Sequence, residues 1–163
     1  MSGVLEVERK YNLFEMNFPS RVPEKIDITE QMIEVIGLEP LEAYLSRDLL
    51  LVLKSESQVK NLSPDFSKML ALADGLGVIT TAQSQSVDFV SRCFYPKLGV
   101  NEDPVTGSAH SNLIPFWASK LNKTKMIAKQ LSEREGILYC ELLNDRVKIS
   151  GTAVLYLQGE IHI

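Results

Sequence analysis

The segment that follows EDPVTG, SAHSNLIPFWASKL, is the stretch that most constrains what this chain can fold into. Apolar residues recur there at three- and four-residue steps, at Ala109, Leu113, Phe116, Trp117 and Leu121. Ile114 and Ala118 widen the apolar stripe until it covers most of the circumference. A helix with such a pattern cannot lie on a surface, so we expect it to be buried on most sides. The chain has 163 residues, which is enough for one ordinary domain with such a core.

The rest of the chain is rich in short β-strand patterns. We expect strands at residues 4–9, 13–18, 49–53, 78–81, 87–94, 137–143, 147–150 and 153–157, and a further short one at 160–163. Two shorter helices are also predicted, one capped by Asp27 and ending before Gly37, the other beginning at Ser63-Pro64. Strands and helices do not alternate strictly, so the pattern favours an α+β fold with a mixed sheet over a doubly wound one.

Composition excludes several classes of function. The net charge is −4 and no long basic run is present, which gives nucleic-acid or anionic-membrane binding no electrostatic support. No apolar run approaches the length of a membrane span, and no signal peptide is recognisable, so we expect a cytoplasmic protein. Two cysteines and two histidines are too few and too dispersed for a metal cluster. The sequence therefore predicts neither metal nor nucleic-acid partners.

The concentrated polar chemistry of the chain lies in EDPVTGSAH, residues 102–110. Asp103 can accept hydrogen bonds from free amides, and Gly107 lets the backbone approach another molecule closely. Amides at the start of a helix have no partner within the helix, and the helix dipole adds positive potential, so this end can bind an anion. A small carboxylate held there would have Asp103 beside it to carry a proton and Ser108 to donate a hydrogen bond.

Other interpretations of the same residues stay open. Asp103 and Thr106 are also good helix caps and nothing more. Ser108 lacks the G-x-S-x-G context of a serine nucleophile, and His110 fits a structural hydrogen bond better than a general base. Gly75-Leu76-Gly77 lacks the full dinucleotide fingerprint and is interpreted as a helix exit.

The segment DFVSRCFYPKLGVNEDPVTGSAHSNLIPFWASKL resembles the signature of the PhzF-like (phenazine biosynthesis) isomerase family, which has a diaminopimelate-epimerase-like fold. The resemblance continues through AKQLSEREGILYCELLNDRVKISGTAVLYLQGEI and reaches back through SRDLLLVL and GVITTAQ. It implies a mixed β-sheet curled around a central helix. It assigns residues 27–163 to the family's C-terminal domain, and a strand pair within residues 1–20 to the end of its N-terminal domain.

The resemblance also implies an activity. Family members perform cofactor-independent acid/base proton transfer on a small carboxylate substrate in a cleft between two such domains. By that resemblance Asp103 and Ser108 are catalytic, and Gly107, Ser108 and Thr106 bind the substrate. The main proton-carrying glutamate of the family belongs to the half that this chain does not match, and nothing in residues 1–60 replaces it. The chain alone is therefore expected to be inactive.

Two alternatives to the isomerase remain at this stage: a non-catalytic scaffold or interaction domain derived from the same fold, and a small-anion binding protein that uses the helix end alone. The strands within residues 4–18 would lack cover, so we expect a homo-oligomer or a complementary N-terminal domain as partner. Glu135 replaces the first glycine of the family's R-G-G pattern, which we expect to alter only a turn.

Overall fold

The structure, a computed structural model, describes residues 5–161. Its ten strands are β1 (Glu6–Lys10), β2 (Leu13–Pro19), β3 (Glu24–Ile26), β4 (Glu42–Leu45), β5 (Leu49–Val52), β6 (Val78–Gln83), β7 (Phe89–Phe94), β8 (Lys125–Gln130), β9 (Gly136–Leu143) and β10 (Arg146–Gly151). Its helices are α1 (Glu30–Ile36), α2 (Glu56–Lys60), α3 (Phe66–Ala71), the short 3-10 helix η1 (Pro96–Leu98) and α4 (Gly107–Leu121). The α+β class is confirmed.

All ten strands belong to one sheet, in the order β1-β2-β10-β9-β8-β7-β6-β5-β4-β3. The pairs β5–β6 and β7–β8 are parallel and the others antiparallel, so the sheet is mixed, as expected. Strands β2 and β3 are eight strand spacings apart along this order, about 38 Å on a flat sheet. Yet they are consecutive in the chain, and the five peptide steps from Pro19 to Glu24 can span at most about 18 Å. The sheet must therefore curl until its two ends approach each other.

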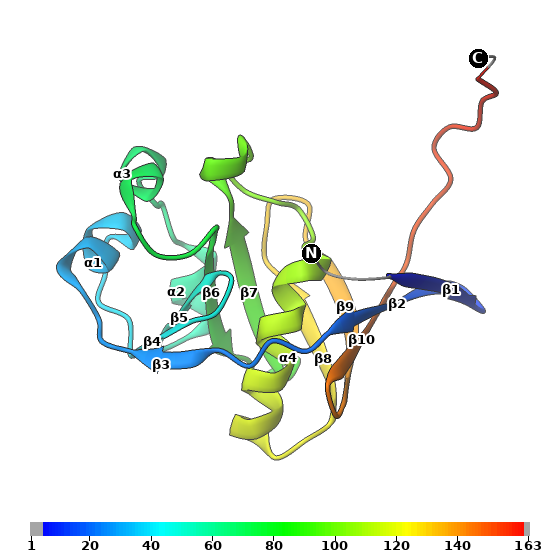
Figure 1. The fold of residues 1–163 in the computed structure, drawn as a ribbon, viewed down its shortest axis with the longest axis horizontal. Helices are drawn as coiled ribbons and strands as arrows, with labels where there is room; N and C mark the ends of the chain where they lie inside the picture. Colours follow the sequence, from blue (N-terminus) through cyan, green and yellow to red (C-terminus); the bar gives the residue numbers. More distant parts are fainter. Residues whose placement is uncertain (1–4, 162–163) are drawn as a thin grey trace.

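Helix α4 occupies the inside of the curl (Figure 1). The connection between β2 and β3 passes along it, and the amide of Arg21 donates to the carbonyl of Ser111 at 2.9 Å. Ten consecutive residues of the helix, 109–118, are buried. The burial that the sequence predicted for this helix is confirmed.

Two apolar cores lie on opposite faces of the sheet. One surrounds α4, and the other lies between the sheet and helices α1, α2 and α3. Strand β5 contributes to both, because Leu50 joins the first core while Leu49 and Leu51 join the second. Its unbroken run of apolar residues follows from being covered on both faces.

Several predicted boundaries were wrong, for local reasons. Thr29, not Asp27, caps α1, because its side chain reaches the amide of Met32. Asp65, not Ser63, caps α3 by accepting from the amides of Ser67 and Lys68. The first predicted strand began at Val4, which lies outside the described residues; the observed β1 begins at Glu6.

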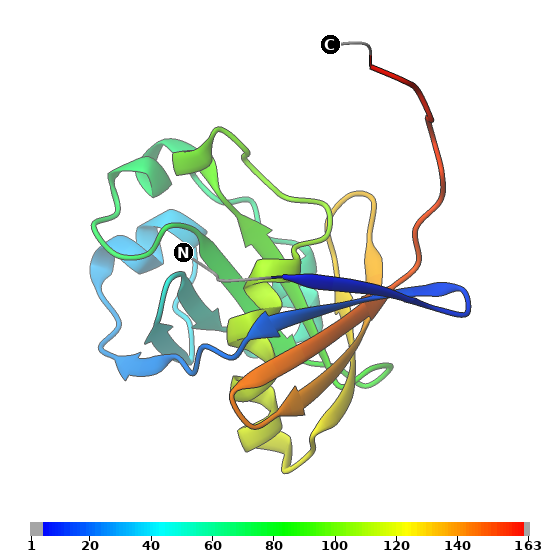
Figure 2. The ribbon, with the colours of Figure 1, turned by 45° about the vertical axis from the view of Figure 1, so that its right-hand side comes forward.

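The strand predicted at residues 153–157 does not form among the described residues. Residues 152–161 run away from the body of the molecule as an extended tail (Figures 1 and 2). A strand needs a neighbour, and both edges of β10 are already paired, with β9 and β2. The apolar side chains of the tail are consequently exposed, from 80% at Leu157 to 97% at Tyr156. The further strand predicted at 160–163 lies partly outside the described residues, and its described part is also unpaired.

The strand pair at the start of the chain is continuous with the rest of the sheet. β2 pairs with β10 over six residues, from Arg146 opposite Pro19 to Gly151 opposite Phe14. Leu5, just before β1, and Val7 and Phe14 in the strand pair are exposed, as the sequence led us to expect for strands without cover. Leu13 and Met16 are partly buried, so the expected lack of cover holds only in part for β2. The assignment of residues 1–20 and 27–163 to two family domains stays a prediction.

Candidate functional site

The loop that leads from β7 into α4 is held from both sides. Arg92 in β7 pairs with Glu102 through two hydrogen bonds of 2.7 and 2.8 Å, and its remaining Nη1 donates to the carbonyl of Leu62 at 2.8 Å. The amide of Asp103 donates to the carbonyl of Cys93 at 3.0 Å. Glu102 therefore fixes the loop, and Asp103 begins the turn into the helix at a defined place.

Asp103, Thr106 and Gln130 form the next layer of contacts. The Thr106 hydroxyl donates to Oδ2 of Asp103 at 2.8 Å. Gln130 in β8 accepts from the Thr106 amide at 2.8 Å and donates from Nε2 to the Asp103 carbonyl at 2.6 Å. Thr106 is buried, whereas Asp103 is partly exposed, and Oδ1 of Asp103 has no hydrogen bond to any residue between 5 and 161 that the structure records. The carboxylate is oriented by one oxygen and open at the other.

The start of α4 differs from the starts of the other α-helices. Helices α1, α2 and α3 are each capped by a side chain, from Thr29, Ser55 and Asp65. Thr106 occupies the N-cap position of α4 but gives no side-chain hydrogen bond to the helix, because its hydroxyl is turned to Asp103. Over the described residues no side chain accepts from the amides of Gly107 or Ser108. The two hydrogen-bond donors that the sequence placed at the helix end are therefore available to a ligand.

Gly107 borders an open groove of about 760 Å³ between β2, β10 and the turn before β9. A side chain at position 107 would meet Met16 at 3.4 Å and Phe18 at 3.5 Å, which is near the limit of ordinary contact. The side of Gly107 on which a Cβ atom would stand therefore faces β2. Arg134 and Glu135, both exposed before β9, also line the groove and bring one charge of each sign to it.

Ser108 has a neighbour that sequence reasoning did not anticipate. Nη2 of Arg47, in the turn between β4 and β5, donates to Oγ of Ser108 at 3.1 Å. The same guanidinium grips the carboxylate of Asp48 through contacts of 3.2, 3.1 and 2.6 Å. Asp48 is fully buried, and it also accepts from Tyr95 at 3.4 Å and from Asn112 at 3.3 Å. Burial acts to lower the pKa of Arg47, but the ion pair with Asp48 outweighs it and raises that pKa.

His110 has the structural role that the sequence suggested. It is completely buried, and its Nδ1 lies 2.7 Å from the carbonyl of Thr106. Burial lowers the pKa of His110 to about 4, so the ring is neutral at pH 7 and Nδ1 carries the proton that it donates. Cys93 and Cys140 are also buried, and burial raises the pKa of both thiols, that of Cys140 to about 12. Neither thiol is activated for chemistry.

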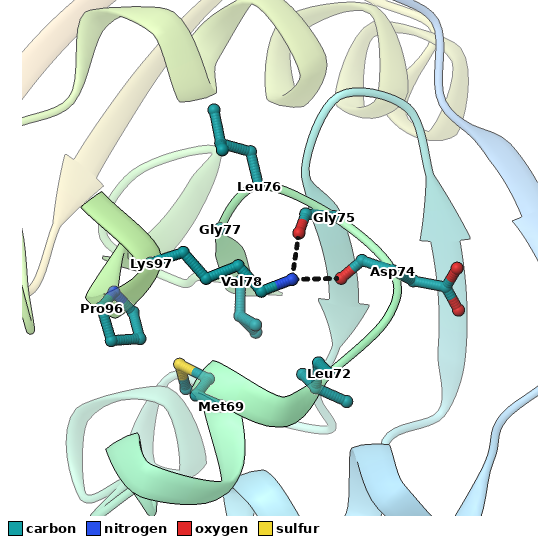
Figure 3. Close-up of a pocket in the computed structure, with 9 residues that line it drawn as sticks. All are labelled: Met69, Leu72, Asp74, Gly75, Leu76, Gly77, Val78, Pro96 and Lys97. Atoms are coloured by element: carbon teal, nitrogen blue, oxygen red, sulfur yellow. Dashed lines mark hydrogen bonds between the residues drawn. The ribbon is translucent and has the colours of Figure 1, made fainter. Parts of the chain in front are cut away.

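A second hollow, beside η1, is a packing crevice. Figure 3 shows it lined by Met69, Leu72 and the loop 74–78, with the Lys97 ammonium donating to the carbonyls of Gly75 and Asp74. It has no room for a water molecule. The loop that Lys97 holds also contacts the turn that carries Arg47. The amide of Leu76 in this loop donates to the Arg47 carbonyl at 2.9 Å.

Among residues 5–161 no group of three or more histidine, cysteine, aspartate or glutamate side chains is arranged to hold a metal ion. None of the helices in this part of the chain is long and apolar enough to cross a membrane.

A family model described as phenazine biosynthesis-like protein matches residues 5–159. The chain belongs to this phenazine biosynthesis-like family. It is 43% identical over 162 residues to an uncharacterized isomerase of Pseudomonas aeruginosa, covering 99% of this chain and 62% of the relative. An uncharacterized isomerase of Halalkalibacterium halodurans is 43% identical over 164 residues, with 98% and 62% covered.

A crystal structure of a PhzF family phenazine biosynthesis protein from Enterococcus faecalis has the same fold. The TM-score is 0.93 at 50% identity, covering 98% of this chain and 61% of that one. The diaminopimelate-epimerase-like fold expected from the resemblance is thereby confirmed. The chain spans about 62% of the length of the relatives that it matches.

The departure from the phenazine biosynthesis-like pattern at Glu135 lies in a turn, as expected. Glu135 has φ of 56°, a left-handed conformation that glycine adopts without strain. Its amide donates to the carbonyl of Ser132 at 3.0 Å, and its carboxylate pairs with Lys129 at 2.8 Å. The left-handed backbone conformation at position 135 thus explains why the family pattern has a glycine there.

Proposed function

We propose that this chain supplies one half of the active site of a PhzF-like isomerase or epimerase, the C-terminal half. The reaction is cofactor-independent acid/base proton transfer on a small carboxylate substrate. The observation that carries the proposal is the start of α4, where the amides of Gly107 and Ser108 have no side-chain cap while a carboxylate and a hydroxyl lie within the same turn.

Each residue at the helix start has a distinct role in this proposal. The amides of Gly107 and Ser108 bind the substrate carboxylate, helped by the positive end of the helix dipole. Asp103 exchanges a proton through its open oxygen, and Ser108 donates a hydrogen bond to a substrate oxygen. Thr106, whose hydroxyl bonds to Asp103, contributes to binding by orienting that carboxylate.

The second carboxyl group that proton transfer across a substrate requires would come from the part of the relatives' length that this chain does not span. The exposed apolar surface supports such a complement. Val154, Leu155, Tyr156 and Leu157 form a continuous exposed run in the tail, and Leu5 and Val7 are exposed on the strand pair. Exposed apolar surface of this kind marks an interaction surface. We therefore propose a complementary N-terminal domain as its partner, with self-association as the outcome when that domain is absent.

The binding half of the proposal is tested by NMR on the 163-residue chain. Titration with sodium sulfate, and separately with sodium benzoate, is expected to shift the amides of Gly107 and Ser108 first, with Kd near millimolar because only half of the site is present. The amides of Asn122 and Lys123 at the other end of α4 serve as the internal control and should not move. Shifts that spare Gly107 and Ser108 would leave the helix start with a structural role only.

The catalytic half is tested by adding the missing region from the Pseudomonas aeruginosa relative as a separate chain. Deuterium incorporation into 2,3-dihydro-3-hydroxyanthranilate should appear only in the reconstituted pair. Asp103→Asn should lower turnover about 10²-fold, as loss of a general acid or base does. Asparagine keeps the acceptor that Thr106 needs, so the fold is preserved. Unchanged turnover in this variant would show that Asp103 only orders the turn through Thr106.

The exposed tail also favours a second candidate, a non-catalytic interaction domain derived from the same fold. In that case the reconstituted pair would associate without any deuterium exchange. Light scattering on the chain with and without the added region separates the two kinds of partner. A complex only with the added region supports a complementary domain, whereas a stable dimer of the chain alone supports self-association.

A further inference from the structure

Arg47 lies where it can set the hydrogen-bonding role of the Ser108 hydroxyl. Its guanidinium lies between the Asp48 carboxylate and the Ser108 hydroxyl, with Nη2 at 2.6 Å from Oδ2 of Asp48 and 3.1 Å from Oγ of Ser108. The side chain is 29% exposed, whereas Asp48 is completely buried. Residues 47 and 108 are far apart in the sequence, so the curled sheet brings them together.

The chemistry of these two groups fixes the direction of the hydrogen bond. Arginine has five N–H donors and no acceptor, so Ser108 Oγ must accept from Arg47. A hydroxyl that accepts in this way still has its own proton, and within the described residues no other side chain takes that proton. Ser108 therefore keeps a free hydroxyl proton to donate, polarised by the cation from which its oxygen accepts.

The position of Arg47 is itself fixed by its surroundings. Asp48 holds the guanidinium through both Nε and Nη2, and is in turn held by Tyr95 and Asn112. The backbone of the turn is fixed by the loop shown in Figure 3: the amide of Leu49 donates to the carbonyl of Gly77 at 2.9 Å, just as Leu76 bonds to Arg47. The guanidinium is thus held by its neighbours on both the carboxylate and the backbone side.

We propose that Arg47, clamped by the buried carboxylate of Asp48, is a positioning residue that holds the Ser108 hydroxyl as a hydrogen-bond donor. The inference rests on the proposed function, and it deepens it by defining the ligand chemistry. The Ser108 hydroxyl and the amides of Gly107 and Ser108 place three donors at the helix start, so this position binds oxygen acceptors such as a carboxylate in preference to an ammonium, while the open oxygen of Asp103 is the acceptor beside it.

The first test needs no ligand. Three-bond Hα–Hβ couplings report the χ1 rotamer of Ser108, which should be single in the wild-type chain. Arg47→Lys keeps the charge beside Asp48 but lacks the planar fork that reaches two partners, so the Ser108 couplings should become averaged. Arg92→Lys is the matched control, since Arg92 grips Glu102 in the same bidentate way without contacting Ser108. Unchanged couplings in Arg47→Lys, or averaged couplings in the wild type, would overturn the proposal.

The second test measures binding of inorganic sulfate at pH 7 by amide shifts of Gly107. Ser108→Ala and Arg47→Lys should each weaken the affinity about fivefold, the size of one ordinary hydrogen bond. In the double variant the loss should equal that of Ser108→Ala alone, because Arg47 acts through Ser108. Losses that multiply would show that Arg47 contacts the anion directly, which would overturn the positioning role.

The two tests separate this inference from the proposed function. If sulfate fails to bind the wild type while Ser108 is held in one rotamer by Arg47, the positioning stands and the carboxylate site fails. If sulfate binds normally and Arg47→Lys changes neither the rotamer nor the affinity, the site stands and the positioning fails. Binding of methylammonium ion in preference to sulfate would contradict the ligand chemistry.

Discussion

The two ends of helix α4 differ in how their backbone groups find hydrogen-bond partners. At the C-terminal end the backbone provides its own cap. Asn122 adopts a left-handed conformation with φ of 52°, and its amide donates to the carbonyl of Ala118. Lys120 places its charge near the negative end of the dipole and pairs with Glu42 at 2.6 Å. At the N-terminal end the amides stay without a side-chain cap, while charged and polar groups are buried around them.

The two ends also differ in the free-energy cost of burying their polar groups. The polar contacts at the C-terminal end are near the surface, where ion pairs contribute little and water can replace them. The N-terminal end keeps the Asp48 carboxylate and the neutral ring of His110 fully buried, and a buried carboxylate is expensive unless it is paired, as Asp48 is with Arg47. A buried charge beside uncapped donors is the observation on which the proposed site rests.

The largest expected effect comes from removing the cation at the N-terminal end. Arg47→Met leaves the Asp48 carboxylate buried with only Tyr95 and Asn112 as partners, so the free energy of unfolding should fall by about 3–5 kcal/mol. Urea denaturation at pH 7 measures it. A loss below about 1 kcal/mol would mean that water reaches Asp48 and that the two helix ends are alike.

A pH titration of stability tests the burial of His110. The pKa of its ring is lowered to about 4 in the folded state, against about 6.5 in the unfolded chain. As the pH falls below 6.5 the unfolded state takes up the proton first, so stability decreases between pH 6.5 and 4, by about 3 kcal/mol over the whole range. His110→Asn, whose amide can still donate to Thr106, should lose this part of the pH dependence. Identical pH profiles for the two proteins would contradict it.

Gly77→Ala should disturb the N-terminal end indirectly. A methyl group there would collide with the ring of Tyr95, whose hydroxyl bonds to Asp48. We expect a loss of about 1–3 kcal/mol from overpacking, measured by thermal unfolding. Gly159→Ala is the control, because that position opens into free space. Equal melting temperatures for both variants would show that Tyr95 yields without cost.

The smallest effect is expected at the C-terminal end. Lys120→Met is chemically parallel to Arg47→Met but should cost at most about 1 kcal/mol, since Glu42 keeps Tyr44 and Lys25 as partners. The hydrogen bonds from Lys120 and Tyr44 lower the pKa of Glu42 to about 2. In Lys120→Met that pKa should rise toward its usual range, as NMR titration of the carboxyl carbon can show. A loss as large as that of Arg47→Met would remove the contrast between the two ends.

The elements that depend on local pattern were predictable from the sequence. The apolar periodicity of residues 107–121 indicated a buried helix, and the EDPVTGSAH motif placed Asp103, Thr106, Gly107 and Ser108 at its start. Helix caps were harder, because Asp27, Thr29, Ser63 and Asp65 are all capable caps and only the tertiary position of the chain selects among them.

Contacts between distant segments could not be predicted. Arg47 and Asp48 lie 61 and 64 residues from the α4 residues to which they bond, Ser108 and Asn112. The available signal was an aspartate directly before the wholly apolar strand β5, a position where a charge is seldom buried without a partner. Gly77 was interpreted as part of a helix exit, whereas its role is to admit the Tyr95 ring, which no local pattern shows.

The order of the strands also constrains how the protein can be made. The sheet neighbour of β2, β10, spans Arg146–Gly151, so about 130 further residues must be synthesised after β2 before the two can pair. Pairing at such sequence separation is slow, and an unpaired strand is prone to aggregate while it waits. The acidic and basic side chains of β1, at Glu6, Glu8, Arg9 and Lys10, suit a segment that must stay dissolved during translation. The sheet can therefore close only after β10 has been synthesised.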